Sequence, residues 1–272
     1  MFLALVNRFL RTTLTLVAFL YFLAPAPAPA EEEQLPTLRV VAYNIKHGRG
    51  MDGKVNLERI AAVLRALKPD LVALQEIDNK CTRSGSIDEA AALGKLLGME
   101  HRFGSFMKFQ GGEYGLAVLS RIPIQKTIRH QLAPGAEPRC SLEIVVHPRG
   151  SKWPLSFLSI HNDWTKEGFR VAQVNDLIKG LADRKHPVML AGDFNAQPGD
   201  QSLKLLEMAG YIQLDKKGAK TFPSHDPRVE IDYFMTRGMT FPSPPVCTVH
   251  DEKVASDHRP IVTVLPLPKA DN

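Results

Sequence analysis

The stretch PVMLAGDFN, residues 187–195, passes from an apolar run into a polar cluster within a few residues. Apolar runs of this length are typical of buried strands. Gly192 permits a tight exit from the strand, and in an extended segment Asp193 and Asn195 would lie on one face, opposite Phe194. That face could use a carboxylate to activate water and an amide to hold a phosphate oxygen. An Asx-turn, which uses the same residue types, is the alternative interpretation.

Four further polar clusters adjoin apolar runs elsewhere in the chain. They are Asn44 after LRVVAY, Glu76 after DLVALQ, His161 after LSFLSI, and Asp257 with His258 before RPIVTV. Acids, amides and histidines at strand ends are how an open sheet presents a reaction centre to solvent. The set is rich in oxygen donors and contains no cysteine, which suits a hard cation such as Mg²⁺. These clusters therefore predict a metal-dependent phosphoester hydrolase.

The Ser256-Asp257-His258 segment allows its acid and its imidazole to serve different partners, because adjacent side chains of an extended chain diverge. Asp257 could bind a metal while His258 turns to Asp232. An aspartate partner fixes the imidazole tautomer and favours its cationic form, which can stabilise charge on a reacting phosphate. A helix cap or a loop-stabilising pair is the alternative. His161, similarly, could be a hydrogen-bonded histidine of the core.

Interleaved helix and strand patterns indicate a layered α/β architecture. We expect strands at 38–43, 71–74, 188–191, 231–235 and 261–265, and helices at 57–67, 87–97, 171–181 and 202–208. Short segments separated by turn residues between 103 and 160 predict antiparallel strands. Residues 211–231 are polar and poorly patterned, so a long surface loop is expected there.

The first thirty residues have the order of a secretory signal: Arg8 and Arg11, an apolar stretch at 14–23, and a small-residue tract ending in Ala28-Pro29-Ala30. An uncleaved N-terminal membrane anchor is the alternative, but its apolar part is shorter than the roughly 20 residues that span a bilayer. We therefore expect a signal peptide at 1–30, a leader at 31–37, and a secreted or periplasmic product.

Cleavage would remove two of the 34 basic residues and none of the 29 acidic ones, leaving a net charge of +3. This mild balance, without a dense Lys/Arg run, does not identify nucleic acid as a partner. The 242 residues that remain of 272 suit one large domain, expected at 38–268. Cys81, Cys140 and Cys247 allow one disulfide at most. No protein partner is evident.

Seven motifs follow one another along residues 38–265. They are YNI at 43–45, LQE at 74–76, YGLAVLSR at 114–121, IH at 160–161, GDFN at 192–195, IDY at 231–233 and SDH at 256–258. Together they resemble the endonuclease/exonuclease/phosphatase superfamily, which includes DNase I-like nucleases, inositol polyphosphate 5-phosphatases and bacterial sphingomyelinases. The resemblance implies a DNase I-like fold of the α/β (α+β) class, a sandwich of two mixed β-sheets flanked by helices.

The resemblance also implies roles for the matching residues. Asn44, Glu76 and Asp257 would lie on the metal side and hold Mg²⁺, with Mn²⁺ or Ca²⁺ as alternatives. Asp193 would orient or deprotonate the attacking water, and Asn195 would hold the phosphate.

The histidines take the remaining roles that the resemblance implies. His258, paired with Asp232, would stabilise the pentavalent transition state. His161 matches a second catalytic histidine of nucleases and sphingomyelinases, whereas repair-type apurinic endonucleases carry a tyrosine there. Glu113 is a candidate partner of His161.

Five further residues are weaker candidates for substrate contact. Arg49 in HGRGMDG, Arg83 in CTRSG and Tyr114 could contact the substrate phosphate, and arginine suits bidentate contact. Solvent exposure is the alternative for both arginines. Trp164 and Phe169 could contact a base or a membrane, or serve only in packing.

We expect a secreted, divalent-metal-dependent phosphoesterase that hydrolyses a phosphodiester, such as a phospholipid head group, by in-line attack of activated water. A secreted DNase I-like nuclease is one alternative, and it would show a basic track beside the site. A non-catalytic binding domain of the same fold is another, although it would not need these acids and histidines. Lipid head groups, nucleic acid and inositol phosphates stay open as substrates, as does peripheral membrane contact, because fold does not decide them.

Overall fold

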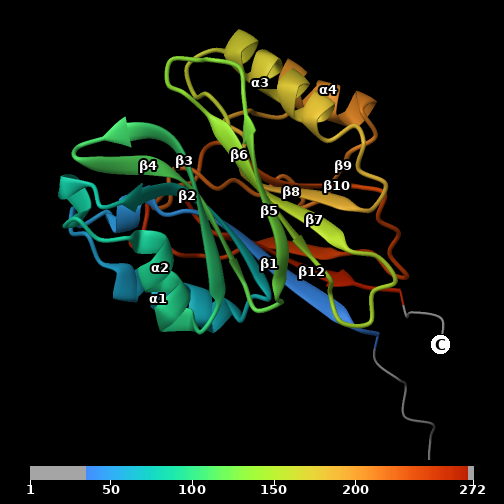
Figure 1. Ribbon diagram of the computed structural model, residues 1–272, viewed down its shortest axis with the longest axis horizontal. Helices are drawn as coiled ribbons and strands as arrows, with labels where there is room; N and C mark the ends of the chain where they lie inside the picture. Colours follow the sequence, from blue (N-terminus) through green and yellow to red (C-terminus); the bar gives the residue numbers. More distant parts are fainter. Residues whose placement is uncertain (1–34, 269–272) are drawn as a thin grey trace, which may run out of the picture. The chain divides into compact units, whose positions relative to one another are not determined.

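Two six-stranded β-sheets face each other in the computed structural model, and pairs of helices cover their outer faces (Figure 1). The structure describes residues 35–268, so the signal peptide predicted at 1–30 and most of the leader lie outside the described residues. The first strand begins at Thr37. Across residues 35–268, no helix combines the length and apolar character needed to cross a membrane. The layered sandwich of mixed sheets is confirmed.

The first sheet has the strand order β11-β12-β1-β2-β4-β3. Its strands are β1 (Thr37–Asn44), β2 (Leu71–Asn79), β3 (Glu100–Phe109), β4 (Gly112–Ser120), β11 (Val246–Val249) and β12 (Ile261–Pro266). Strands β1 and β2 are parallel, and the other neighbours in this sheet are antiparallel. Asn44 pairs with Gln75 at the end of the parallel pair.

The second sheet has the order β5-β6-β7-β8-β10-β9. Its strands are β5 (Ile124–Gln131), β6 (Cys140–Val146), β7 (Leu155–His161), β8 (Val188–Asp193), β9 (Ile212–Gln213) and β10 (Asp232–Arg237). Here β7 and β8 form the parallel pair, and His161 pairs with Asp193 at its end. Parallel strands finish at the same edge of a sheet, so each sheet brings polar side chains together there.

Helices α1 (Leu57–Leu67) and α2 (Glu89–Leu97) pack on the first sheet, and α3 (Glu167–Gly180) and α4 (Gln201–Met208) pack on the second (Figure 1). Two short 3₁₀ turns, η1 (Lys46–Gly48) and η2 (Thr82–Ser84), follow β1 and β2. The side chain of Asn56 accepts a hydrogen bond from the amide of Arg59 and caps α1. Asp88 caps α2 in the same way, which is why this helix begins at 89 rather than 87.

Alternate residues of β1 face different hydrophobic layers. Val40 and Ala42 point into the core between the sheets, while Val41 and Tyr43 pack beneath α1 and α2. A strand buried on both faces needs an unbroken apolar run, and this accounts for the sequence of β1.

Two expectations about the chain's organisation need correction. Strand β2 does not end at 74 but continues to Asn79, because Gln75 bonds Ser159 of the other sheet at 3.0 Å and Ile77 is buried. The segment 211–231 is not simply a surface loop. It contains β9, and its Lys216 and Thr221 are buried against polar partners.

Candidate active site

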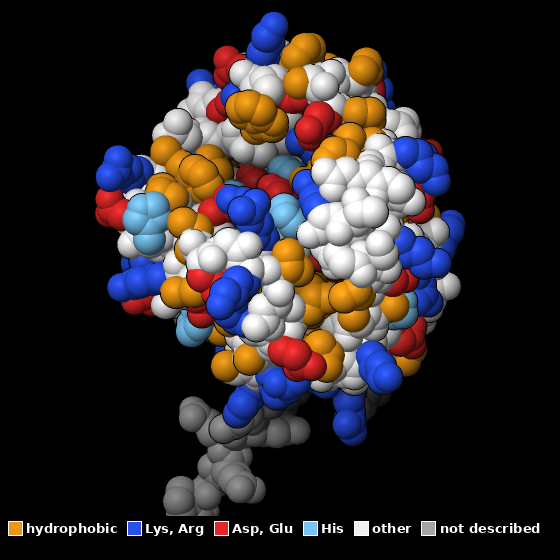
Figure 2. Space-filling view, turned by 90° about the vertical axis from the view of Figure 1, so that its left-hand side faces the viewer, with side chains coloured by type: hydrophobic (Ala, Val, Ile, Leu, Met, Phe, Trp, Pro, Cys, Tyr) orange, Lys and Arg blue, Asp and Glu red, His pale blue; other side chains and the backbone are white. Residues whose placement is uncertain are grey.

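A pocket of about 470 Å³ brings together residues from both sheets and the loops beside them. Its lining consists of Glu76, Tyr114, Glu137, Arg139, His161, Trp164, Asp193, Asn195, Phe222, Ile231, Asp257 and His258. Figure 2 shows a hollow with acidic and histidine side chains at its bottom and hydrophobic side chains on its rim, in keeping with this composition. Residues predicted from separate motifs therefore meet in one pocket.

Glu76 reaches this pocket from a β-bulge inside β2. Its neighbours Gln75 and Ile77 pair with consecutive residues of β4, which leaves Glu76 as the extra residue, with a φ of 59°. Positive φ is uncommon for a residue with a side chain, and bulges re-aim side chains next to active sites. Glu76 was expected at the end of a strand, but it lies inside β2. The bulge turns its carboxylate out of an otherwise buried strand.

Asn44 connects the acidic groups of the two sheets. Its Nδ2 donates hydrogen bonds to Glu76 Oε1 at 3.0 Å and to Asp193 Oδ2 at 3.2 Å. Its Oδ1 accepts a bond from the amide of Lys46, so the side chain is held at both ends. One buried amide thus fixes the separation of two carboxylates that come from different strands.

The Asp193–Asn195 segment forms a turn rather than an extended stretch. Asp193 Oδ1 accepts a hydrogen bond from the Asn195 amide at 2.8 Å, and Asn195 has a φ of 50°. This is the Asx-turn, so the extended geometry was wrong. The turn still leaves both side chains in the pocket, where Asn195 is fixed by a bond from its Nδ2 to the carbonyl of Asn162 at 3.0 Å. The same turn therefore places Asp193 and Asn195 in the pocket.

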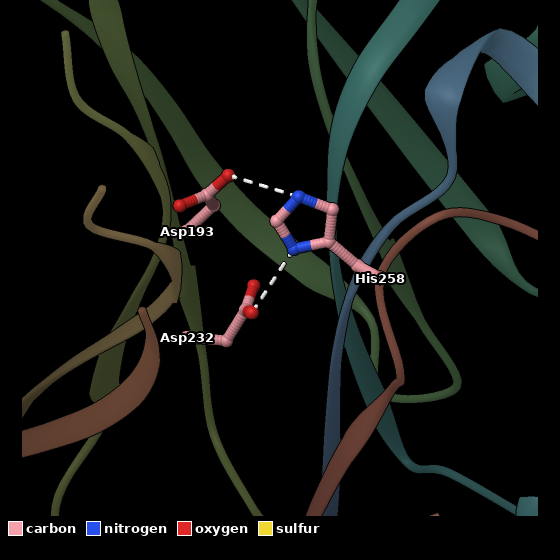
Figure 3. Close-up of side chains that lie close together, drawn as sticks. All are labelled: Asp193, Asp232 and His258. Atoms are coloured by element: carbon pink, nitrogen blue, oxygen red, sulfur yellow. Dashed lines mark hydrogen bonds and ion pairs between the residues drawn. The ribbon is translucent and has the colours of Figure 1, made fainter. Parts of the chain in front are cut away.

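His258 lies between two aspartates (Figure 3). Its Nδ1 is 3.0 Å from Asp232 Oδ2, and its Nε2 is 3.6 Å from Asp193 Oδ2. Thr221 donates a hydrogen bond to Asp232, and the ring of Phe222 lies 4.8 Å from the imidazole centroid. The predicted pairing of His258 with Asp232 is therefore confirmed.

Burial and neighbouring charges have opposing effects on the pKa values of His258 and Asp193. Burial lowers the pKa of His258, but the charges of Asp232 and Asp193 outweigh burial and raise that pKa to about 10. Burial also raises the pKa of Asp193, against the effect of the imidazolium. A protonated His258 places a buried positive charge beside the carboxylate that is the candidate base.

Among the described residues, Asp193, Asp232 and His258 offer ligand atoms within 4.8 Å of one another. A protonated imidazole has no free lone pair and so cannot bind a metal, which favours a proton- and charge-holding role for this trio. Glu76 and Asp257 line the same pocket, and Asp257 Oδ2 is 2.6 Å from Lys46 Nζ. Their carboxylates form an oxygen-donor set without sulfur, which fits a hard divalent cation. Asn44 adjoins this set through its Nδ2, because its Oδ1 accepts from the Lys46 amide.

His161 is buried, with its Nε2 3.7 Å from Asp193 Oδ2. Burial, together with the charges of Arg139 and His258, holds the pKa of His161 well below its ordinary value, so the ring is neutral. Glu113 is not its partner. That carboxylate pairs with Lys108 at 2.9 Å and lines a separate cavity of about 550 Å³.

The three candidates for phosphate contact differ in their placement. Tyr114 lines the pocket. Arg83 donates two bonds of 2.8 Å to Asp78, and its guanidinium lies over the rings of Phe109 and Tyr114. Arg49 is exposed and is not part of the lining. The structure thus brings only Tyr114 of these three to the site.

Sequence reasoning missed Arg139 and Glu137, and left Trp164 undecided. All three line the pocket, whereas Phe169 does not and lies 5.5 Å from the ammonium of Lys166. Arg139 directly precedes the CSLEIVV strand and belongs to none of the seven motifs, so no signal in the sequence pointed to it. The side chain of Trp164 is 65% exposed, so it does not serve in packing.

The sequence model of the Endonuclease/Exonuclease/phosphatase family matches residues 41–258. The chain belongs to this family. Members of the family are phosphoester hydrolases and typically depend on a divalent metal. The match runs from within β1 to His258 and so includes all candidate site residues. No curated protein matches this sequence significantly.

Solved structures of endonuclease/exonuclease/phosphatase proteins share the fold. A family member from Beutenbergia cavernae DSM 12333 is 23% identical, with a TM-score of 0.71 over 85% of this chain and 72% of that one. The mannosyl-6-phosphatase Bt3783 of Bacteroides thetaiotaomicron VPI-5482 is 17% identical, with a TM-score of 0.67 over 84% and 99%. Truncated Caenorhabditis elegans TDP2 is 17% identical, with a TM-score of 0.62 over 84% and 97%.

Proposed function

We propose that this protein is a secreted or periplasmic, divalent-metal-dependent hydrolase that cleaves a phosphodiester, such as a phospholipid head group, by in-line attack of water. The supporting observation is the approach of Asp193, Asn195 and the His258–Asp232 pair within one pocket that also contains Glu76 and Asp257. A binding domain would not need a buried imidazolium aimed at a buried carboxylate.

Each side chain has a role that follows from its position. Asp193 accepts the proton of the attacking water, since its carboxylate is held by Asn44 and by the Asn195 amide. The His258 imidazolium and the side-chain Nδ2 of Asn195 stabilise negative charge that develops on the phosphoryl oxygens. Asp232 keeps His258 protonated and oriented. These groups are fixed before substrate arrives, so little reorganisation accompanies the reaction.

The metal side of the pocket is formed by Glu76, Asp257 and Asn44. The two carboxylates would hold Mg²⁺, or Mn²⁺ or Ca²⁺ in its place, while Asn44 fixes Glu76 through its Nδ2. A bound ion supplies Lewis-acid polarisation and a template for in-line attack. Lys46 already contacts Asp257 at 2.6 Å, so its ammonium contributes positive charge to the same side. Within the described part of the chain Glu76 forms no ion pair, so it is the carboxylate that the proposal relies on most.

Substitution Glu76→Gln should weaken Mg²⁺ binding by at least about tenfold, because a neutral amide replaces the carboxylate that the bulge directs into the pocket. The measurement is calorimetric titration of metal-free protein with MgCl₂, alongside hydrolysis with Mg²⁺ and with EDTA. Glu207→Gln on the exposed face of α4 is the matched control. Unchanged Mg²⁺ affinity in Glu76→Gln would remove this residue from the metal side.

Trp164 is the residue best placed to contact the group attached to the phosphate. Its indole is 65% exposed and lines the pocket, whereas Trp153, the second tryptophan, is 57% exposed and lines another cavity. We expect Trp164→Ala to raise KM about tenfold with little change in kcat, since a contact shared by substrate and transition state affects mainly binding. Trp153→Ala is the control. An equal effect of both substitutions would contradict the role.

The test of the proposed function is hydrolysis across a substrate panel. The panel contains bis(p-nitrophenyl) phosphate, sphingomyelin, phosphatidylinositol, inositol polyphosphates and plasmid DNA, each with Mg²⁺ and with EDTA. Mannose 6-phosphate is added because one protein of this fold is a mannosyl-6-phosphatase. Metal-dependent cleavage of a lipid diester supports the proposal, and preference for DNA with strong salt dependence supports the nuclease instead. No hydrolysis with Mg²⁺ or Mn²⁺ would contradict both.

A further inference from the structure

Arg139 stands immediately before β6 and lines the pocket that holds the candidate catalytic residues. It is only 1% exposed and is among the largest fully buried side chains of the described protein. An arginine buried to this degree is rare unless its charge is paired, because guanidinium stays ionised at any ordinary pH. Its hydrogen-bond partners therefore need to be accounted for.

The guanidinium of Arg139 is only partly satisfied. Its Nη2 lies 2.9 Å from Glu137 Oε2, and its centre lies 4.9 Å from the ring centroid of Phe106. Its Nε and Nη1 have no hydrogen-bond partner within the described part of the chain. Buried N–H donors of a cation that lack acceptors cost folding free energy. A ligand that supplies acceptor oxygens would remove this cost.

A second unsatisfied group lies on the same pocket. His161 Nδ1 is buried and has no hydrogen-bond partner among residues 35–268. Arg139 and His161 both line this pocket. An anion with several acceptor oxygens, bound in this pocket, would offer partners to both.

We propose that Arg139 binds a non-bridging oxygen of the substrate phosphoryl group, and that Glu137 is a positioning residue for it. Glu137 contacts one nitrogen of the guanidinium. Its side chain is 40% exposed, so it can move toward solvent when a phosphate binds. The ligand class is a phosphoryl or similar tetrahedral oxyanion, which arginine can contact through two N–H groups. This inference rests on the proposed function, because it assumes that the pocket receives a phosphoester.

Arg139 takes the role that sequence reasoning assigned to other arginines. Arg83 uses two of its nitrogens on Asp78, and Arg49 is exposed away from the lining. Arg139, in contrast, is buried, has two nitrogens without hydrogen-bond partners among the described residues, and lines the pocket.

The experiment compares Arg139→Met, Arg139→Lys and wild type in the full mature chain with Mg²⁺. Binding of inorganic phosphate is measured by calorimetry, KM and kcat are measured on the best substrate, and folding is followed by circular dichroism and thermal melting. Arg149→Met is the control, because Arg149 is exposed beyond the opposite end of β6. We expect Arg139→Met to weaken phosphate binding and raise KM by about 10- to 100-fold. Lysine should restore part of the loss, because it keeps the charge but not the planar fork.

The outcomes separate this inference from the proposed function. Loss of phosphate binding in Arg139→Met, with no hydrolysis of any substrate by the wild type, supports Arg139 as an oxyanion ligand and contradicts the hydrolase. Phosphate affinity and KM unchanged in folded Arg139→Met overturn the inference. Should Arg139→Met fail to fold, Arg139→Lys decides. Wild-type phosphate affinity and KM in the lysine variant would then reduce Arg139 to a structural role, and a weakened affinity would support the inference.

Discussion

Substitution Asp193→Asn should lower the rate of phosphoester hydrolysis by about 10²- to 10⁴-fold, the range expected when a general base is removed. The amide cannot accept the proton of the attacking water at neutral pH. It also removes the negative charge that faces His258 Nε2 at 3.6 Å. Both losses act on the transition state, so the effect should fall mainly on kcat.

The fold should tolerate this change. Asparagine has nearly the shape of aspartate and can keep the turn in which the residue-193 side chain accepts from the Asn195 amide. The measurement is kcat and KM on the best substrate, with thermal melting to confirm folding. Asp226→Asn, on an exposed side chain paired with Arg228, is the control. A rate within about threefold of wild type would remove Asp193 from the role of base.

Substitution His258→Ala should lower kcat by about 10²- to 10³-fold, which is the usual effect of deleting one preorganised group that stabilises developing negative charge. Its imidazolium is buried, with Nε2 3.6 Å from the carboxylate of the candidate base Asp193. Asp232→Asn should have a smaller effect in the same direction, because His258 remains but loses the partner that orients it at 3.0 Å.

The controls for His258 address stability, because its removal leaves Asp232 buried with only Thr221 as a side-chain partner. Deleting one partner of a buried ion pair is strongly destabilising, so the melting midpoint of His258→Ala is measured first and the assay is run well below it. His225→Ala changes an exposed histidine of the neighbouring loop and should be neutral. Full activity in folded His258→Ala would contradict its role.

Local sequence patterns predicted the strands and helices well because they recur with the period of each element. Apolar runs marked β1, β7 and β8, which are buried on both faces, and helical spacing marked α1. The sandwich of two mixed sheets came from the motif resemblance, and the strand order was not predicted, since period alone does not pair strands. The extension of β2 was missed because Gln75 and Glu76 look like the polar end of a strand, although Gln75 is buried between the sheets.

The candidate site was predictable where a residue belongs to a motif, and less so where its role depends on three-dimensional neighbours. Asp232 and His258 are 26 residues apart, and their motifs predicted that they pair. Arg139 was missed because its significance lies in two unpaired nitrogens and a shared pocket, which no spacing reveals. Likewise, nothing in the sequence indicated that Asp257 would contact Lys46, since that contact joins residues 211 positions apart.

Asn44 belongs to one sheet and Asp193 to the other, yet a single hydrogen bond of 3.2 Å joins them. The proposed metal carboxylate Glu76 belongs to the first layer and the proposed base to the second, so neither sheet contains a complete reaction centre. A slip of the layers past each other would separate the two half-sites while leaving every strand intact. Catalysis in this protein is thus a property of how the two layers are aligned, and it could be lost while secondary structure remains unchanged.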